Sequence, residues 1–360
     1  MNHFSIPMPF DSSLIEKAVS INQHVSKSRI ATMYNCLPFN AKGKSGFEQN
    51  RMTDSRVENL DEFLRLVELV QKKDISFVYL MNSLRTISYR SFYRNERKFR
   101  KFVQTLLSNG ITGIRAASPL LIDYLQCNFP KIQIFCSTSQ EYHSIRQYRN
   151  LICAYPNIIE VIPSWDENRN FEFLESFVQS FPSMSIELMV NEGCVSGCPF
   201  RLHHSLVDPD SRKRKNTRFL HFFTDECSKI IDRNFWLRIS MLNVIYPWQI
   251  ETYNEIGINH FKLVGRNSLL FHDGSYLDIY ESYLKGVDDV NLIIDQPIFM
   301  FNNNFCNSHI LPKYTVRELI SLLPNIKYFQ TAKPRCGDHC GVHCRVCYDC
   351  AQKIQDIYPH

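Results

Sequence analysis

Two groups of cysteines could perform metal or redox chemistry in this chain. Cys194 and Cys198 lie four residues apart in the run NEGCVSGCPFR, which begins at Asn191. Five more cysteines lie close together near the C-terminus: Cys336, Cys340, Cys344, Cys347 and Cys350. Thiols this closely spaced, in a chain that shows no export signal, favour metal or iron–sulfur ligation over disulfides. The total of 13 cysteines is odd, which also fits a reducing compartment, so we expect a cytoplasmic protein.

The bulk composition is that of an ordinary folded protein. Of the 360 residues, 44% are hydrophobic and 21% are charged, which excludes a disordered chain. The net charge of +5 is too small to make nucleic acid the expected partner. The first residues lack the basic start and apolar run of a signal peptide, and no apolar stretch approaches the ~20 residues that span a bilayer. We therefore expect no membrane span.

Short apolar runs alternate with amphipathic segments along most of the chain. The runs predict strands at 29–35, 76–81, 111–116, 132–136, 158–163, 185–190, 235–240 and 260–265. The segments between them predict helices at 60–71, 96–107, 119–125, 140–152, 170–181 and 248–256. Eight strands joined by helical crossovers indicate a parallel sheet. The predicted fold is α/β, a (β/α)8 TIM-type barrel with a C-terminal cysteine-rich appendage. An open doubly wound sheet is the alternative, weakened because no Gly-x-Gly-x-x-Gly turn follows the first predicted strand.

The pattern changes after the last predicted strand. Helices are expected at 276–285 and 316–323, and the cysteine-rich segment closes the chain. We therefore expect a barrel over residues 1–290 and a C-terminal extension with a metal-binding tail over residues 291–360.

Reactive side chains follow several of the predicted strands. Cys36 ends the first, Glu192 and the Cys194–Cys198 pair follow the sixth, and Arg266 follows the eighth. Because the carboxyl ends of barrel strands meet at one face, these groups are expected to converge there. Cys227 is a candidate third ligand and Cys36 a candidate fourth. Four thiolates suit zinc or a cubane cluster, and the dispersed ligands favour an iron–sulfur cluster. The alternative is that these are buried free thiols.

The tail is a separate candidate metal site. Cys340, Cys344, Cys347 and Cys350 are expected to hold a second cluster or a zinc ion, with Cys336 spare and His339 or His343 as substitutes. The spacing from Cys340 to Cys347 matches that of radical S-adenosylmethionine enzymes. In those enzymes a barrel follows the motif, whereas none follows here, so that interpretation is rejected. The alternative is a flexible, reducible end.

Charged residues also fall inside predicted strands. Glu187, Arg238 and Lys262 could form an interior layer that holds an anionic substrate, provided that they pair with one another. The alternative is that they face the helices or solvent. Glu192 and His203 are candidate catalytic groups, the histidine as a proton donor, although surface histidines are more frequent. The basic run 212–215 could steer an anionic substrate or RNA, or could be a solvated loop.

Three segments resemble the U32 peptidase family, also known as the collagenase-like peptidases. They are YNCLPF from Tyr34 with the later GKSG from Gly43, the run NEGCVSGCPFR from Asn191, and GINHFKLVGR from Gly257. The likeness covers roughly residues 28–290. It implies a four-iron cluster and oxygen-independent hydroxylation, as in several relatives that are not proteases in practice. Cys194, Cys198 and Cys227 look like that cluster's ligands, and Cys36 stands where one branch places another. The compressed spacing around Cys194 and the multi-cysteine tail depart from the family pattern.

These observations lead to one main hypothesis and two alternatives. The main one is a 4Fe-4S protein that hydroxylates or otherwise oxidises an anionic small molecule, a peptide or RNA, with Arg266 and Lys262 anchoring the anionic group. A redox partner or companion subunit would then be needed. One alternative is a metal-dependent peptidase, although the chain has no His-Glu-x-x-His and no Gly-x-Ser-x-Gly. The other is a non-catalytic partner protein that docks through its metal-bound tail.

Overall fold

The structure is a computed structural model. It describes residues 1–38, 41–48, 56–84, 89–192, 194, 196–207, 226, 237, 241, 243–265, 274, 276–286, 336–337, 340 and 342–357. Among these residues no helix is long and apolar enough to cross a membrane.

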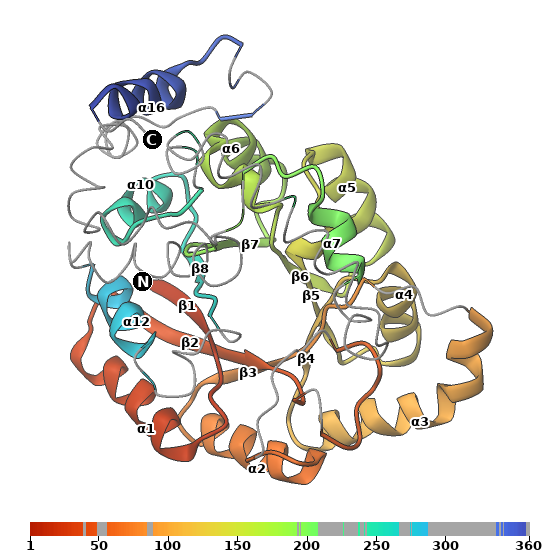
Figure 1. The fold of residues 1–360 in the computed structure, drawn as a ribbon. Helices are drawn as coiled ribbons and strands as arrows, with labels where there is room; N and C mark the ends of the chain where they lie inside the picture. Colours follow the sequence, from red (N-terminus) through yellow and green to blue (C-terminus); the bar gives the residue numbers. More distant parts are fainter. Residues whose placement is uncertain are drawn as a thin grey trace.

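Eight parallel strands close into a barrel in chain order (Figure 1). They are β1 (Asn2–Pro7), β2 (Ser28–Asn35), β3 (Ser76–Met81), β4 (Gly113–Ala116), β5 (Gln133–Cys136), β6 (Ile158–Val161), β7 (Ser185–Met189) and β8 (His260–Lys262). Closure occurs where β1 pairs with β8, from His3 opposite His260 to Ser5 opposite Lys262. The predicted fold class is therefore confirmed.

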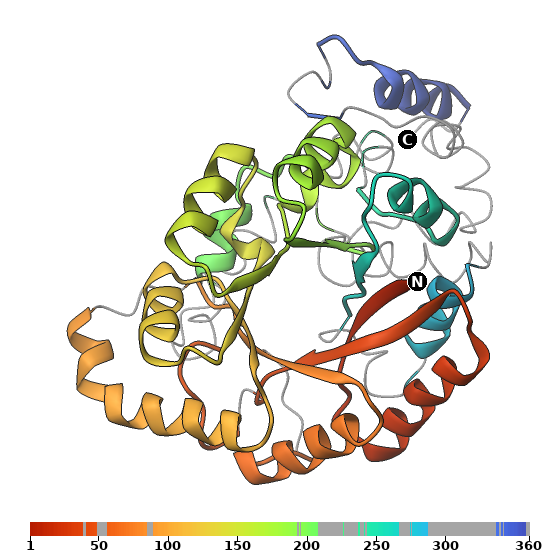
Figure 2. The same cartoon turned by 180° about the vertical axis from the view of Figure 1, so that it is seen from behind.

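Helices form an outer ring around the strands (Figures 1 and 2). They are α1 (Ser12–Ile21), α2 (Leu60–Gln71), α3 (Tyr89–Ser108), α4 (Pro119–Asn128), α5 (Ile145–Ala154), α6 (Phe171–Ser180), α7 (Arg201–Val207), α10 (Ile250–Asn254), α12 (Tyr276–Lys285) and α16 (Val346–Ile357). Four short 3-10 helices are η1 (Asn22–His24), η2 (Thr138–Gln140), η3 (Trp165–Arg169) and η4 (Pro247–Gln249). In both views α16 lies outside the barrel, beyond α6 and α10.

Local sequence signals fix where several helices begin. Asn59 precedes α2, and its side chain accepts a hydrogen bond from the Glu62 N–H. Ser144 and Gln147 form a capping box at the start of α5. Such caps satisfy N–H groups that have no partner within the helix, which defines the point at which the chain leaves the preceding loop.

Two strand predictions need correction. The first strand is β1, which the sequence prediction missed, so the predicted strand at 29–35 is the second strand, β2. The predicted strand at 235–240 is not part of the barrel, because β7 pairs directly with β8. Leu237, the one residue of that run within the described part of the chain, is helical. A short apolar run does not distinguish a strand from a buried helix. In β1 the buried apolar residues Phe4 and Ile6 alternate with His3 and Ser5, which line a cavity in the barrel, so no apolar run marks this strand.

A charged layer occupies the barrel interior. The Arg115 side chain is 1% exposed, and its Nη2 lies 2.9 Å from Glu160 Oε1 and 2.7 Å from Glu187 Oε2. Glu160 Oε2 in turn lies 3.2 Å from His260 Nδ1. The predicted interior position of Glu187 is confirmed, and the layer is mutually paired, as burial of charge requires. Arg238 lies outside the described residues.

The N-terminal mouth of the barrel is hollow. A cavity of about 530 Å³ is lined by residues that include His3, Gln133, Glu160, Ser185 and His260. The imidazole rings of His3 and His260 stack with their centroids 5.0 Å apart. Burial, followed by the nearby charge of His260, lowers the pKa of His3, so this ring stays neutral beside its neighbour.

Replacing Arg115 with methionine should destabilise the fold by about 3–5 kcal/mol, because Glu160 and Glu187 would remain buried without their cation. Denaturant unfolding of the full chain measures the difference. The matched control is Arg65→Met on the exposed face of α2, which should change stability by less than about 0.5 kcal/mol. Adding Glu187→Gln to Arg115→Met should restore part of the loss. Equal stabilities for the two arginine variants would contradict the buried triad.

The His260–Glu160 pair should make stability depend on pH. Burial alone would lower the pKa of His260, but Glu160 raises it above 6.5; burial alone would raise the pKa of Glu160, but His260 and Arg115 lower it below 4.5. The pair therefore stabilises the folded state fully only between about pH 4.5 and about pH 6.5. The stability difference between wild type and His260→Gln should shrink by roughly 1 kcal/mol from about pH 5.5 to about pH 9. His24→Gln, an exposed histidine, is the control; a difference that does not change with pH would refute the pairing.

Candidate active site

Asn191 fixes the loop that leaves β7. Its side-chain amide donates to the Val264 carbonyl at 3.0 Å, and its Oδ1 accepts from the Val264 N–H at 2.7 Å. This two-way contact continues the β7–β8 pairing beyond the last residues of both strands. The residues that follow, Glu192 and Cys194, are thereby held at the C-terminal mouth of the barrel, the face at which barrel enzymes carry their chemistry.

Cys194 and Cys198 lie together at this mouth. Cys194 packs against an apolar floor of Ile162, Trp165 and Met189, and Val264 packs against the same three residues. Its thiol makes a hydrogen bond with that of Cys198, and this contact, together with burial, raises the pKa of Cys194. The nearby cation of Arg201 acts in the opposite direction and favours the thiolate. The two sulfurs thus lie side by side at this mouth.

Arg201, at the start of α7, is the principal cation beside the thiols. Its guanidinium binds both Asp166 oxygens, Nη1 at 3.0 Å from Oδ2 and Nη2 at 3.1 Å from Oδ1. Nη1 also lies 3.4 Å from Glu141 Oε2, and the guanidinium carbon lies 5.7 Å from the centroid of the Trp165 ring. Burial raises the pKa of Glu141, while Arg201 and a hydrogen bond from Ser164 oppose that rise.

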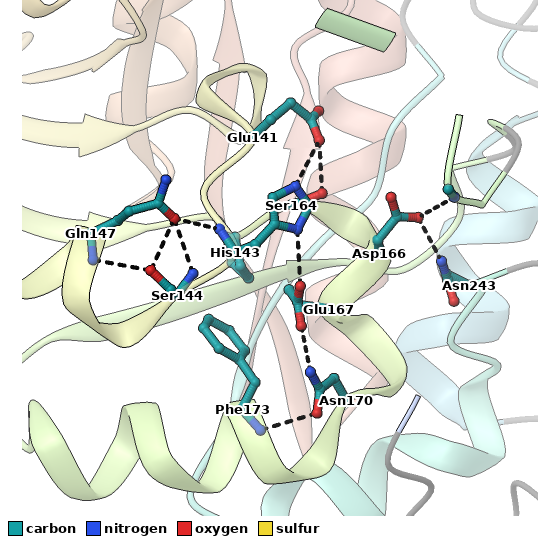
Figure 3. A network of polar contacts seen from close by, with 12 residues as sticks. Glu141, His143, Ser144, Gln147, Ser164, Asp166, Glu167, Asn170, Phe173 and Asn243 are labelled. Atoms are coloured by element: carbon teal, nitrogen blue, oxygen red, sulfur yellow. Dashed lines mark hydrogen bonds and ion pairs between the residues drawn. The ribbon is translucent and has the colours of Figure 1, made fainter. Parts of the chain in front are cut away.

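Asp166 also fixes the backbone between the two cysteines. Its Oδ1 accepts from the Gly197 N–H at 3.1 Å and from Asn243 Nδ2 at 3.1 Å, the second contact being visible in Figure 3. Asn243 Nδ2 lies 3.0 Å from Ser196 Oγ. Gly197 has φ +63°, a conformation that favours glycine. The Cys194–Cys198 loop is thus held at two of its three inner residues, Ser196 and Gly197.

A chain of polar contacts continues from this network toward α6 (Figure 3). His143 Nδ1 lies 2.9 Å from Glu167 Oε1, and Asn170 Nδ2 donates to Glu167 Oε2 at 2.7 Å. The hydrogen bond with Glu167 raises the pKa of His143. Asn170 also caps α6 by accepting from the Phe173 N–H at 3.2 Å. The network thus joins the thiol mouth to the packing of α5 and α6.

Lys262 lies inside the barrel, one layer below the thiols. Its Nζ is 4.1 Å from the centroid of the Tyr34 ring, and the residue is 6% exposed. Met189 is the cross-strand partner of Lys262 and is also part of the floor beneath Cys194. Lys262 therefore faces the barrel interior, next to a residue on which Cys194 packs.

Cys36 lies elsewhere on the barrel. It is fully buried at the end of β2, and its side chain acts on the hydroxyl of Tyr79, whose pKa is raised by burial and by the charges of Glu48 and Cys36. Two strands, β1 and β8, separate β2 from β7 in the barrel. This structure therefore brings Cys194 and Cys198 together after β7 and leaves Cys36 at the end of β2.

The remaining predicted site residues have different positions. Glu192 is half-buried, and its charge raises the pKa of Cys194, so it stands beside the thiols. His203 is exposed on α7. Cys227 and Arg266 lie outside the described residues.

Sequence reasoning missed Arg201, Asp166 and Glu141. Arg201 closes the motif that begins at Asn191, so its position three residues after Cys198 was the available signal. Asp166 and Glu141 come from loops after β6 and β5 and carry no motif. Only the fold brings them to the arginine.

The arrangement is suited to holding soft metal ions. It offers two adjacent sulfurs on an apolar floor, a cation that favours their ionised form, and a carboxylate at the same mouth. Thiolates are the preferred ligands of zinc and of iron–sulfur clusters. A neighbouring arginine offsets the negative charge that such ligation accumulates.

Comparison with known proteins leaves the activity open. No family model and no curated sequence matches the chain. Among solved structures the chain is similar to a U32 peptidase, with a TM-score of 0.45 and 12% identity over 74% of this chain and 93% of that one. It is also similar to the endo-1,4-beta-mannanase from Rhizomucor miehei, with a TM-score of 0.38 and 8% identity over 77% and 94%. A third similar structure is the O-GlcNAc hydrolase of Thermobaculum terrenum, with a TM-score of 0.37 and 11% identity over 97% of this chain and 93% of that one. Likeness this distant, to proteins with different activities, says nothing about the chemistry of this chain.

Replacing Arg201 with methionine should loosen the thiol loop. Asp166 and Glu141 would lose their shared cation. We therefore expect the free energy of unfolding to fall by about 1–3 kcal/mol and proteolysis between residues 191 and 207 to become faster. Thermal unfolding and limited proteolysis with mass spectrometry measure both effects. Arg146→Met, on the exposed face of α5, is the matched control. Identical cleavage patterns for the two variants would show that Arg201 does not anchor the loop.

Proposed function

We propose that this chain is an iron–sulfur oxidoreductase whose cluster lies at the C-terminal mouth of the barrel. The observation that supports it most is the adjacent pair Cys194–Cys198 on its apolar floor, with the Arg201 cation beside it. The sequence resemblance to the U32 family points to the same two cysteines. In this proposal Cys227 is the third ligand and Cys36 the candidate fourth.

The described residues fit such a cluster in part. Cys194 and Cys198 supply two sulfurs that already face the same place. Cys36 would have to approach them from the end of β2, where it is fully buried and acts electrostatically on the Tyr79 hydroxyl. A cluster, when bound, would supply one-electron redox chemistry.

The protein residues have distinct roles around the cluster. Arg201 offsets the negative charge of the ligated thiolates, and Asp166 keeps that cation in place. Trp165, Met189 and Ile162 keep water from the inner side of the sulfurs. Glu192 is placed to accept or donate a proton at the mouth.

The substrate class follows from the cation below the thiols. Lys262 lies inside the barrel beside its cross-strand partner Met189, where a charge-assisted hydrogen bond could anchor a carboxylate or phosphate. Arg266 is the second proposed anchor. The proposed reaction is hydroxylation or another oxidation of an anionic organic, peptide or RNA substrate, with electrons exchanged with a redox partner.

Purification without oxygen should yield a coloured protein with about four iron and four sulfide ions per chain at this site. Cys194→Ser and Cys198→Ser should each remove that iron, because a serine hydroxyl is a poor substitute for a soft thiolate. Visible absorption together with iron and acid-labile sulfide assays measures the content. Cys153→Ser, an exposed cysteine on α5, should leave it unchanged.

Two results would redirect this proposal. A colourless protein that holds only zinc would overturn the cluster and favour the metal-dependent peptidase or the partner protein. Iron that survives in Cys194→Ser and Cys198→Ser would place the cluster elsewhere. Cys36→Ser tests the fourth ligand, since retained iron in this variant would exclude Cys36.

A further inference from the structure

The five tail cysteines differ in how deeply they are buried. Cys344 is exposed, Cys336, Cys340 and Cys347 are half-buried, and Cys350 is 8% exposed. Free cysteines in a flexible end would be expected to be uniformly exposed. The burial pattern thus separates four of these thiols from Cys344.

The segment before α16 is docked on the barrel through its first cysteine. The Cys336 N–H donates to the Arg169 carbonyl, at the end of η3, over 3.0 Å. The Cys340 N–H donates to the Gly337 carbonyl over 3.0 Å, which turns the chain back on itself. The thiols of Cys336 and Cys340 are hydrogen-bonded to each other, and Cys347 lies close enough for its charge to act on Cys336.

Helix α16 presents the other two sulfurs together. Cys347 and Cys350 are three residues apart in its first turns, so their side chains share a face. Ala351 is 6% exposed and belongs to the main hydrophobic core, which shows that this side of α16 packs onto the barrel. Cys344 precedes the helix, is exposed, and lies outside this face.

We infer that Cys336, Cys340, Cys347 and Cys350 bind one structural zinc ion, and that Cys344 is not a ligand. The set consists of a Cys-x-x-x-Cys turn and a Cys-x-x-Cys pair at the start of a helix, a spacing typical of tetrahedral zinc sites. This ligand set differs from the sequence prediction, which included Cys344 and left Cys336 spare. It is independent of the proposed cluster at Cys194.

Zinc binding at these cysteines should order the tail. Among the described residues no three cysteine, histidine or carboxylate side chains are already gathered into a ligand shell. The Cys347 and Cys350 sulfurs must therefore move toward the Cys336–Cys340 pair, so binding energy is coupled to closure of the tail on η3. The ion would thereby fasten α16 to the barrel.

Alkylation of the full-length wild-type chain, with and without zinc, tests the ligand set without any substitution. Zinc should slow modification of Cys336, Cys340, Cys347 and Cys350 by about tenfold or more, because a bound thiolate is a poor nucleophile for the reagent. Cys344 should react equally fast in both states, as should the exposed Cys127 and Cys153. Peptide mass spectrometry reads each site. Zinc protection of Cys344 with none at Cys336 would overturn the proposed set.

Metal content of two variants provides the second test. Wild type and Cys344→Ser should each hold about one zinc ion per chain, whereas Cys336→Ser should lose it. Cobalt substitution should give the absorption of a tetrahedral four-thiolate site in Cys344→Ser and a weakened, altered spectrum in Cys336→Ser. Iron that is lost on Cys336→Ser but kept in Cys194→Ser would identify a second cluster here and overturn the zinc assignment. A wild-type protein that holds the tail zinc but no iron at Cys194 after purification without oxygen would refute only the proposed function.

Discussion

The pairing of β1 with both β2 and β8 is the constraint on which the rest of the molecule depends. An open sheet would leave two strand edges unpaired, and the loops after β5, β6, β7 and β8 would not meet around one mouth. Closure also creates the interior that holds Arg115. A charge there needs internal partners, and Glu160 and Glu187 reach it only because their strands lie around the same axis.

The short helix η3 connects the two sulfur-bearing regions. Trp165 lies under Cys194, and Asp166 holds Gly197 and Arg201. At its other end the Arg169 carbonyl receives the Cys336 N–H. Between them, Asn168 donates to the carbonyls of Met189 and Asn243, which ties η3 to β7. Both cysteine groups are therefore positioned by five consecutive residues, although they are separated by more than a hundred residues in the chain.

Local patterns in the sequence predicted much of this architecture. Seven of the eight strands were placed within a few residues, and in the structure Cys194 and Cys198 follow one of them, β7. The prediction failed where the determining contact is distant in sequence. Strand β1 pairs with both β2 and β8, and one of these neighbours is far from it in the sequence. Arg201 forms ion pairs with Glu141 and Asp166, and neither carboxylate belongs to a recognisable sequence motif. Burial, invisible in spacing alone, distinguishes Cys344 from the other tail thiols.

The hollow N-terminal mouth, with its stacked His3 and His260, has a consequence for how such a protein can diverge. Its two imidazoles lie at the N-terminal end of the strands, whereas Cys194 and Cys198 follow the C-terminal end of β7. Substitutions of these histidines would change how the stability of the fold depends on pH, while the loop that carries Cys194 and Cys198 stays the same. Adaptation to a new habitat and adaptation to a new substrate would thus draw on separate sets of positions, and the two could evolve without interfering with each other.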